Sequence, residues 1–220
     1  MARYERHNRE LDGQSVSQTA LNTVWNSRCA REIAAFTAHS QADVVHFQNT
    51  FPLMSPAVYG AARRQGAAVV QALRNYRYSC VNGLLFRDGQ ICEACTGRSF
   101  ALPGIQHRCY RHSAVGSAVV ATMQSAHKLM HTYDRQVDVY IAVSAFVREK
   151  YIQFGISPER IVVKPNFVYP DPGAQLTPGD YAVFVGRLSP EKGVRRLVET
   201  WQREQFGMEP VSYTHLRAHE

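Results

Sequence analysis

The chain has no long hydrophobic run and is short of acidic charge. No stretch of its 220 residues reaches the ~18 to 20 apolar residues that a membrane-spanning helix needs. The first twenty residues carry Arg3, Arg6 and Arg9 in place of the apolar core of a secretory leader. Because 45% of the residues are hydrophobic, disorder of the whole chain is excluded. We expect a soluble, intracellular protein.

The shortage of acid leaves the chain basic. It has 25 Lys and Arg residues against 18 Asp and Glu residues, a formal net charge of +7. Such an excess suits phosphates, nucleic acid or anionic lipid head groups, and does not choose among them.

Cysteine is also scarce, with five in the chain, and an intracellular location argues against a disulfide framework. Four of the five share one segment, spaced as Cys80-x11-Cys92-x2-Cys95-x13-Cys109. Zinc prefers four tetrahedral soft ligands, and a Cys-x2-Cys pair can place two thiolates on one ion. The spacing favours a structural zinc site. Unpaired buried thiols and a redox Cys-x2-Cys pair stay open as alternatives, and His107 or His112 could replace one cysteine.

Apolar strands alternate with amphipathic helices along most of the chain. The pattern predicts strands over 43–47, 67–73, 137–143 and 161–164, and helices over 15–36, 57–64, 113–133 and 145–154. This alternation is typical of an α/β protein with a parallel sheet. It breaks over 76–112, which we interpret as a cysteine-rich insertion.

A proline and glycine cluster over 169–180 predicts a linker between two domains. The first domain is expected over 1–168 and the start of a second α/β domain over 181–210. Within the second, 181–185 predicts a buried strand, followed by a helix that opens at Pro190 with Ser189 as its N-cap.

The segment after that strand predicts a phosphate site. Gly186 lets the backbone come close to a ligand, and a helix N-terminus would present unpaired N–H groups to an anion. Arg187 and Lys192 flank this point, so the segment suits a diphosphate. A surface turn with solvated charges is the alternative interpretation.

The segment Val-Gly-Arg-Leu-Ser-Pro-Glu-Lys-Gly-Val over 185–194 resembles the nucleotide-sugar clamp of glycosyltransferase family 4, the retaining enzymes of the GT-B fold. The segments 43–52, 138–144 and 158–166 resemble landmarks of that family's N-terminal domain, in the expected order. The resemblance covers about 3–206. It implies two Rossmann-like domains facing a cleft, with the acceptor bound mainly by the first and the nucleotide sugar mainly by the second.

The resemblance also implies a reaction. A glycosyl group would move from a nucleoside diphosphate sugar to a hydroxyl of a glycan or lipid-linked acceptor, with retention of configuration. Arg187 and Lys192 would stabilise the charge on the leaving phosphates, and no catalytic metal is expected. The implied location is cytoplasmic, at the inner face of the membrane, with contact to anionic lipid and no nucleic-acid partner.

One position departs from the family. Members commonly have a histidine facing the transferred sugar where this chain has Arg74, and arginine stays charged, so it cannot relay a proton. His46 is the nearest alternative of its type, although a histidine that ends a buried strand is more often a hydrogen-bonded core residue. Asn49 and Thr50 follow the same strand and are expected near the acceptor.

Both ends of the sequence affect what we expect of it. Residues 211–220 match a reading frame of a transposon-end sequencing adapter, and we interpret them as adapter translation. Relative to the family, a first strand with a glycine-rich loop and the later Glu-x7-Glu element are missing. The catalytic residues are therefore unknown, and the chain as given is expected to be inactive.

A different class of function is the alternative. It is a zinc-stabilised basic module that binds nucleic acid or a protein partner. The region around the cysteines has six arginines, at positions 74, 77, 87, 98, 108 and 111, which could bind a phosphate-bearing acceptor or an anionic membrane, or form a solvated face. Arg187 and Lys192 after a predicted strand favour the enzyme, because such a module needs no second α/β domain.

Overall fold

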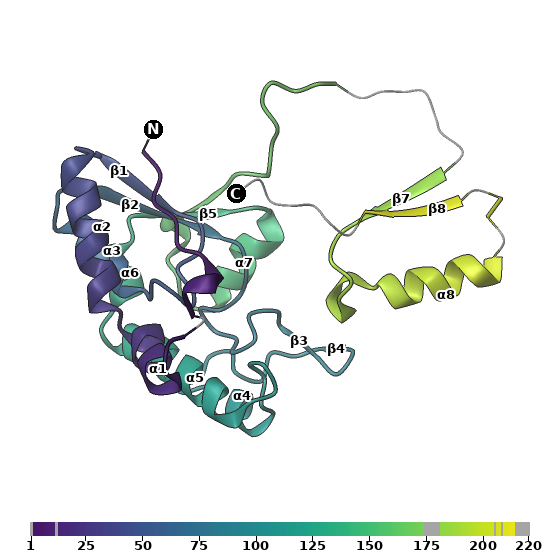
Figure 1. Ribbon diagram of the computed structural model, residues 1–220, viewed down its shortest axis with the longest axis horizontal. Coiled ribbons are helices and arrows are strands. Elements are labelled where there is room, and N and C mark those ends of the chain that lie inside the picture. The colour runs from purple at the N-terminus through teal and green to yellow at the C-terminus, as the bar shows by residue number, and fades with distance from the viewer. Residues whose placement is uncertain (1, 12, 174–180, 205, 208, 214–220) are drawn as a thin grey trace. The chain divides into compact units, whose positions relative to one another are not determined.

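The computed structural model describes residues 2–11, 13–173, 181–204, 206–207 and 209–213 (Figure 1). The chain divides into two compact units. The first, called here the sheet unit, comprises 1–87 and 91–166, and the second comprises 88–90 and 167–220. Residues 174–180 of the predicted linker lie outside the described residues.

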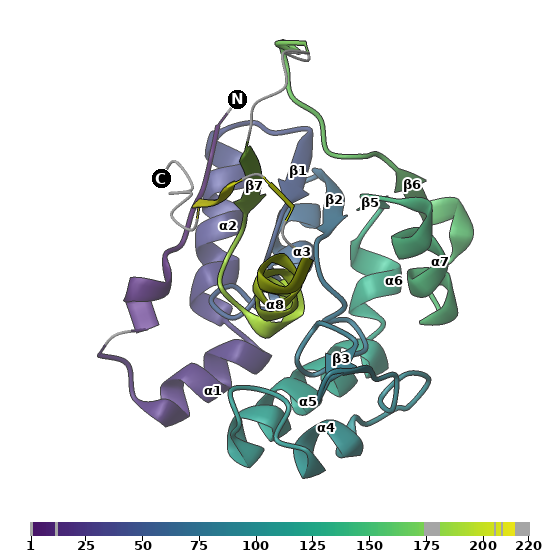
Figure 2. The same ribbon diagram turned by 90° about the vertical axis from the view of Figure 1, so that its right-hand side faces the viewer.

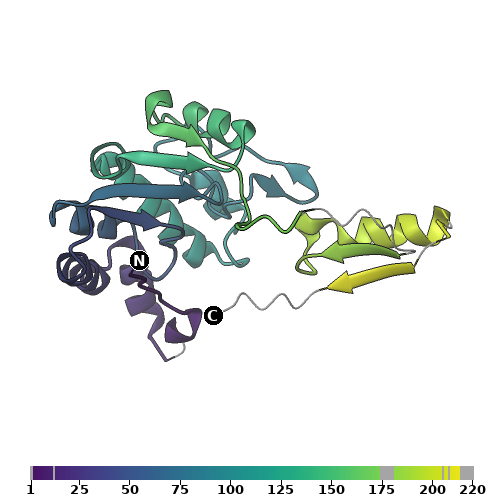
Figure 3. The same ribbon diagram turned by 90° about the horizontal axis from the view of Figure 1, so that it is seen from above.

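A parallel sheet of four strands forms the centre of the sheet unit, in the order β1 (Val44–Phe47), β2 (Ala68–Leu73), β5 (Val139–Ala142) and β6 (Ile161–Val163). Figure 3 shows these strands side by side with their arrows pointing the same way. The prediction of an α/β fold with a parallel sheet is confirmed. Because all four strands are parallel, their carboxyl ends lie at one edge, where ligands bind in such sheets.

Helices connect and cover the strands. Those that lie nearest the sheet are α2 (Ser27–His39), α3 (Ala57–Arg63), α6 (Thr132–Gln136) and α7 (Ala145–Gln153), with the 3-10 turn η2 (Pro158–Arg160) before β6. A second group packs together (Figure 2): α1 (Val16–Val24), α5 (Ala114–Leu129) and α4 (Leu102–Gln106), which belongs to the insertion. The insertion also contains a short hairpin, β3 (Phe86–Arg87) and β4 (Gln90–Ile91).

The two faces of the sheet differ in burial. Val69 and Tyr140 are buried in one core with residues of α3 and α7, such as Val58 and Tyr151. Alternate strand residues point to the opposite face. On that face Val44 is 55% exposed, and Val162 is 53% exposed. In the described residues, the helical layer therefore buries one face of the sheet more completely than the other.

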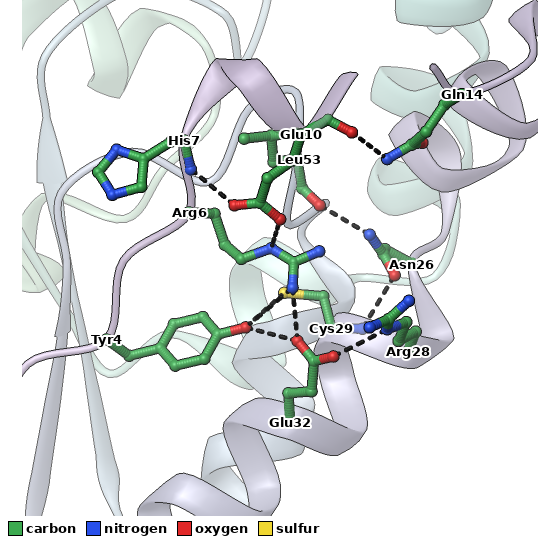
Figure 4. Close-up of polar contacts among 10 residues, drawn as sticks. All are labelled: Tyr4, Arg6, His7, Glu10, Gln14, Asn26, Arg28, Cys29, Glu32 and Leu53. Carbon is green, nitrogen blue, oxygen red and sulfur yellow. Dashed lines mark hydrogen bonds and ion pairs between the residues drawn. The ribbon is translucent and has the colours of Figure 1, made fainter. Parts of the chain in front are cut away.

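One predicted helix is two helices in the structure. The apolar period continues from α1 into α2. Asn26 lies between the two helices and is the N-cap of α2 (Figure 4). Its side-chain oxygen accepts a hydrogen bond from the N–H of Cys29 at 2.9 Å, and its side-chain nitrogen donates to the carbonyl of Leu53 at 2.7 Å. Asn26 thus acts as an N-cap, which satisfies a helix-end donor that would otherwise be unpaired. The predicted helix over 113–133 is similarly divided, into α5 and α6, at His131, where φ is 52°.

The N-terminal segment is held against α2. Figure 4 shows Tyr4 and Arg6 pointing toward the carboxylate of Glu32. The Tyr4 hydroxyl donates to Glu32 Oε2 at 2.6 Å, and Arg6 Nη1 donates to the same oxygen at 2.7 Å. The 3-10 turn η1 (Asn8–Leu11) follows. Polar contacts therefore attach this segment to the sheet unit without a strand.

The second unit contains one βαβ arrangement. Strand β7 (Tyr181–Val185) leads through the 3-10 turn η3 (Pro190–Lys192) into α8 (Val194–Glu204), and then into β8 (Glu209–Tyr213), which pairs with β7 in parallel. The helix begins at Val194 instead of Pro190, because Gly193 between them is left-handed, with φ of 69°. Residues 211–213, which we interpreted as adapter translation, belong to β8, and 214–220 lie outside the described residues.

None of the helices in the described part of the chain is long and apolar enough to cross a bilayer.

Candidate functional site

A pocket opens at the carboxyl ends of β1 and β2 in the sheet unit. Its volume is about 70 Å³. Its rim comes from two loops: residues 48–51 after β1, and Arg74, Asn75, Arg77 and Tyr78 after β2. Its floor comes from core residues that include Tyr59 and Gln71. Sites that enclose a drug-sized ligand usually have ~300 to 1,000 Å³, so this pocket suits one group of a ligand, such as a phosphate or a sugar hydroxyl.

Hydrogen bonds fix the buried part of the pocket. The Tyr59 hydroxyl donates to Gln71 Oε1 at 2.7 Å and lies 3.3 Å from the Thr50 hydroxyl. Gln71 Nε2 donates to the carbonyl oxygen of Ala72 at 2.6 Å. The side chains of Thr50, Tyr59 and Gln71 are all buried. Thr50 is therefore held by the core while it lines the pocket.

Arg74 is anchored at the rim. Its Nε donates to Gln48 Oε1 at 3.2 Å, and its Nη1 donates to Asn166 Oδ1 at 2.5 Å. The guanidinium group is exposed and joins the loops after β1, β2 and β6. These contacts orient a permanent positive charge at the carboxyl edge of the sheet, where an anionic group of a ligand would be attracted.

His46 lies beside this cluster but does not line the pocket. It is exposed, because it points to the less covered face of the sheet, so the core role considered for it is not what the structure shows. Its ring Nε2 is 3.2 Å from Gln48 Nε2. Partial burial, followed by the charges of Arg74 and Lys164, lowers the pKa of His46. The imidazole is therefore mainly neutral at neutral pH.

Arg77 is the second arginine that lines the pocket, beside Arg74. Its guanidinium carbon lies 4.1 Å from the ring centroid of Phe51. Nη1 donates to the carbonyl of Val81 at 2.6 Å, and Nη2 donates to that of Asn82 at 3.1 Å. Burial lowers the pKa of Arg77, yet arginine stays charged in proteins. Arg77 thus holds the turn over 77–82 against the pocket.

The tyrosines of the pocket are hydrogen-bonding groups. Burial raises the pKa of Tyr59 and of Tyr78 to about 12, and also raises the pKa of Tyr133, Tyr140 and Tyr151. Their hydroxyls stay protonated at neutral pH. The described residues that line the pocket include no carboxylate and no imidazole. The pocket is therefore suited to binding a polar ligand more than to taking a proton from it.

The predicted phosphate segment lies in the second unit. Gly186 follows β7 directly, and the side chain of Arg187 is 77% exposed. Arg187 Nη2 lies 3.3 Å from Glu191 Oε1, and the Ser189 hydroxyl donates to the same carboxylate at 2.7 Å. Ser189 occupies the N-cap position of η3, as predicted, but its side chain binds a carboxylate and not a backbone N–H. Lys192 is exposed in the 3-10 turn.

The four cysteines of the insertion approach one another in the sheet unit. Cys80 is buried, and Cys92, Cys95 and Cys109 are half-buried. Burial, followed by the neighbouring thiols of Cys80, Cys95 and Cys92, raises the pKa of Cys109 to about 11. In the described residues, no three Cys, His, Asp or Glu side chains stand in an arrangement that would already hold a metal ion. His107 and His112, the alternative ligands, are exposed.

The structure thus brings Asn49, Thr50 and Arg74 to one pocket of the sheet unit, and Gly186, Arg187 and Lys192 belong to the other unit. Gln48 was not predicted from the sequence, and Arg77 was named only as one of six basic residues around the cysteines, not as part of this pocket. Both lie within four residues of a predicted strand end, and that position is the signal that could have identified them.

No protein-family model matches the chain, and no curated protein matches it either.

Proposed function

We propose that the chain is part of a retaining glycosyltransferase of family 4, which transfers a sugar from a nucleoside diphosphate sugar to a hydroxyl of a glycan or lipid-linked acceptor. One observation carries the proposal. In both units an arginine follows a parallel strand at its carboxyl end, Arg74 after β2 and Arg187 after β7 and Gly186. Ligands of parallel α/β sheets bind at this edge, and arginine suits phosphate groups.

The donor is assigned to the second unit. Arg187 and Lys192 are both exposed; Arg187 precedes the 3-10 turn η3, and Lys192 is its last residue. The ion pair of Arg187 with Glu191 is solvent-exposed, so it contributes at most ~1 kcal/mol and does not prevent Arg187 from binding a diphosphate. When the bond to the leaving phosphate breaks, these cations would stabilise the negative charge that develops.

The acceptor is assigned to the pocket of the sheet unit. Asn49, Thr50 and Asn75 offer hydrogen-bonding groups, and Arg74 and Arg77 offer positive charge. This combination suits a sugar hydroxyl or the phosphate of a lipid-linked glycan. The alternative of a zinc-stabilised binding module would explain the cysteine-rich insertion, but it provides no role for a parallel sheet with cations at its carboxyl edge.

Binding of nucleoside diphosphates tests the donor site without requiring turnover. We expect UDP or GDP to bind the chain in a calorimetric titration, and Arg187→Ala to weaken that binding by a factor of ~10 to 150, the equivalent of one charge-assisted hydrogen bond of ~1.5 to 3 kcal/mol. Arg195→Ala is the matched control, because Arg195 is also exposed and also pairs with a glutamate four residues later, Glu199.

The proposal fails if neither diphosphate binds, or if Arg187→Ala and Arg195→Ala bind as the parent does. An equal loss in both variants would indicate general electrostatic attraction and would also contradict a specific diphosphate site.

A further inference from the structure

Three segments of the insertion that contain cysteines meet around one glycine. Gly104 lies in α4, and a Cβ atom placed on it would be 3.5 Å from the sulfur of Cys95. The Gly104 carbonyl accepts a hydrogen bond from the N–H of Cys109 at 2.9 Å. Val81, which follows Cys80 in the chain, packs so closely on Gly104 that its Cγ2 would be 2.4 Å from that Cβ. Three separate segments of the insertion therefore meet here.

The fourth cysteine is brought to the same place by two constraints. Cys92 is separated from Cys95 by only two residues, which form part of a turn. Its N–H donates to the carbonyl oxygen of Leu85 at 2.9 Å, beside the β3–β4 hairpin. The hairpin thus fixes the backbone of Cys92 close to Cys95, and Cys92 interacts electrostatically with both Cys95 and Cys109.

The surroundings of the thiols are cationic. Each of four positive side chains interacts electrostatically with one of these cysteines: Arg77 with Cys80, Arg87 with Cys109, and Arg98 and Lys128 with Cys95. Four thiolates and one Zn²⁺ ion have a net charge of about −2, which these cations would offset.

We propose that Cys80, Cys92, Cys95 and Cys109 bind one Zn²⁺ ion, and that this site fixes the turn over 77–82, which positions Arg77 at the pocket. Binding releases the four thiol protons to solvent and forms four Zn–S bonds, with no change of oxidation state. In the described residues these side chains do not already form a metal-binding group, and metal binding would draw the sulfurs together, because such sites couple binding to local folding.

The connection to the pocket runs through the turn that contains Cys80. The N–H of Cys80 donates to the carbonyl of Tyr76 at 2.9 Å. The carbonyl of Val81, the next residue, accepts from the Arg77 guanidinium at 2.6 Å. Fixing the sulfur of Cys80 on a metal therefore fixes the turn that positions Arg77 at the pocket.

Metal analysis of the purified chain is the first test. We expect about one zinc ion per chain, and Cys95→Ser or Cys109→Ser should reduce this by a factor of ten or more. Cys29→Ala is the matched control, because Cys29 is a buried thiol on α2, outside the insertion, and it should leave the zinc content unchanged. Circular dichroism of each variant checks that the α/β fold persists.

Cobalt provides a second readout that does not depend on variants. The chelated parent chain should bind Co²⁺ and develop the thiolate charge-transfer and tetrahedral ligand-field absorption bands. Hydrogen exchange should then slow over 76–82 when zinc is added to the chelated chain, while β5 keeps its rate. Zinc below about half an equivalent in the parent chain, or a zinc content that the Cys95→Ser variant retains, overturns the proposal.

Thiol titration distinguishes the alternatives. If the chain as purified contains no zinc, a loss of two thiols on mild oxidation that is absent in Cys92→Ser indicates a redox pair at Cys92 and Cys95, and retention of all five thiols indicates unpaired cysteines. Either result refutes the zinc site. Because zinc content is measured without a donor or acceptor, its outcome is independent of the glycosyltransferase proposal.

Discussion

Replacement of Gly104 by alanine is the sharpest test of the packing around the thiols. In a helix such as α4, alanine is normally favoured over glycine by ~1 kcal/mol. At this position the new Cβ would stand 2.4 Å from Cγ2 and 2.8 Å from Cβ of Val81. Val81 is 1% exposed and β-branched, so it has little space to move and its χ1 rotation is restricted. The steric effect should therefore exceed the helix propensity.

The expected loss follows from the two opposing effects. Forcing an extra methyl group into a packed core costs ~1 to 3 kcal/mol, and an overlap this short belongs in the upper half of that range. After subtraction of the gain in helix propensity, Gly104→Ala should lower the free energy of unfolding of the sheet unit by roughly 1 to 2 kcal/mol.

Gly60 provides the matched control, since it is a second buried helical glycine, in α3. A Cβ on Gly60 would meet Arg64 Nη1 at 3.2 Å and Gln136 Oε1 at 3.5 Å, which are the ends of flexible side chains. These ends can move at little cost. Gly60→Ala should leave the stability unchanged or raise it by up to ~1 kcal/mol.

Tryptophan fluorescence during urea unfolding is the assay. Trp25 stacks on His127 in the sheet unit, with ring centroids 5.4 Å apart, whereas Trp201 lies in α8 of the second unit. A Trp201→Phe background therefore makes the signal specific for the sheet unit. The reasoning is refuted if Gly104→Ala is as stable as its parent, or if Gly60→Ala loses as much as Gly104→Ala.

Three further predictions concern the core. Tyr59→Phe leaves Gln71 Oε1 without its donor, so we expect a loss of ~1 to 3 kcal/mol in the urea assay. Asn26→Ala removes the N-cap of α2 and the hydrogen bond to Leu53, and should cost at least ~1 kcal/mol, also measured by urea unfolding. Burial lowers the pKa of His127 from its ordinary value of 6.5, so the unfolded chain binds this proton more readily. Stability is then full above about pH 6.5 and falls as the pH drops toward the lowered pKa of the folded chain, a loss that His127→Gln should reduce.

Each of these has an opposing outcome. An unchanged urea midpoint in Tyr59→Phe would mean that water or another group replaces the hydroxyl. Retention of full stability in Asn26→Ala would mean that the break between α1 and α2 does not depend on the cap. Equal acid sensitivity of His127→Gln and the parent would assign the pH dependence to other groups.

The strands could be predicted from the sequence because each is a short apolar run between breakers. All four strands of the sheet overlap their predicted ranges, including the isolated run at 161–164 before Pro165. Helix boundaries were less accurate. Apolar periodicity continues through Asn26 and does not distinguish one helix from two, whereas the cap that separates them depends on a partner, Leu53, far along the chain.

The pocket was only partly predictable for the same reason. Asn49, Thr50 and Arg74 could be named because they follow predicted strands. The hydrogen bond from Tyr59 to Gln71 joins a helix to a strand and leaves no local pattern. Strand alternation places His46 and Phe47 on opposite faces of the sheet. The sequence does not show that helices cover these two faces unequally, which leaves the histidine exposed and the phenylalanine buried.

The sheet and the insertion contribute different properties to the pocket. The sheet supplies rigid positions, because Gln71 and Leu73 belong to a strand paired on both sides. The insertion supplies Arg77, whose position depends on the turn over 77–82 and therefore on Val81 and Gly104. A strand tolerates few changes of sequence, whereas a loop held by a small cluster can change length and charge at lower cost. The ligand preference of the pocket should accordingly vary with the insertion, while the fold of the sheet stays the same.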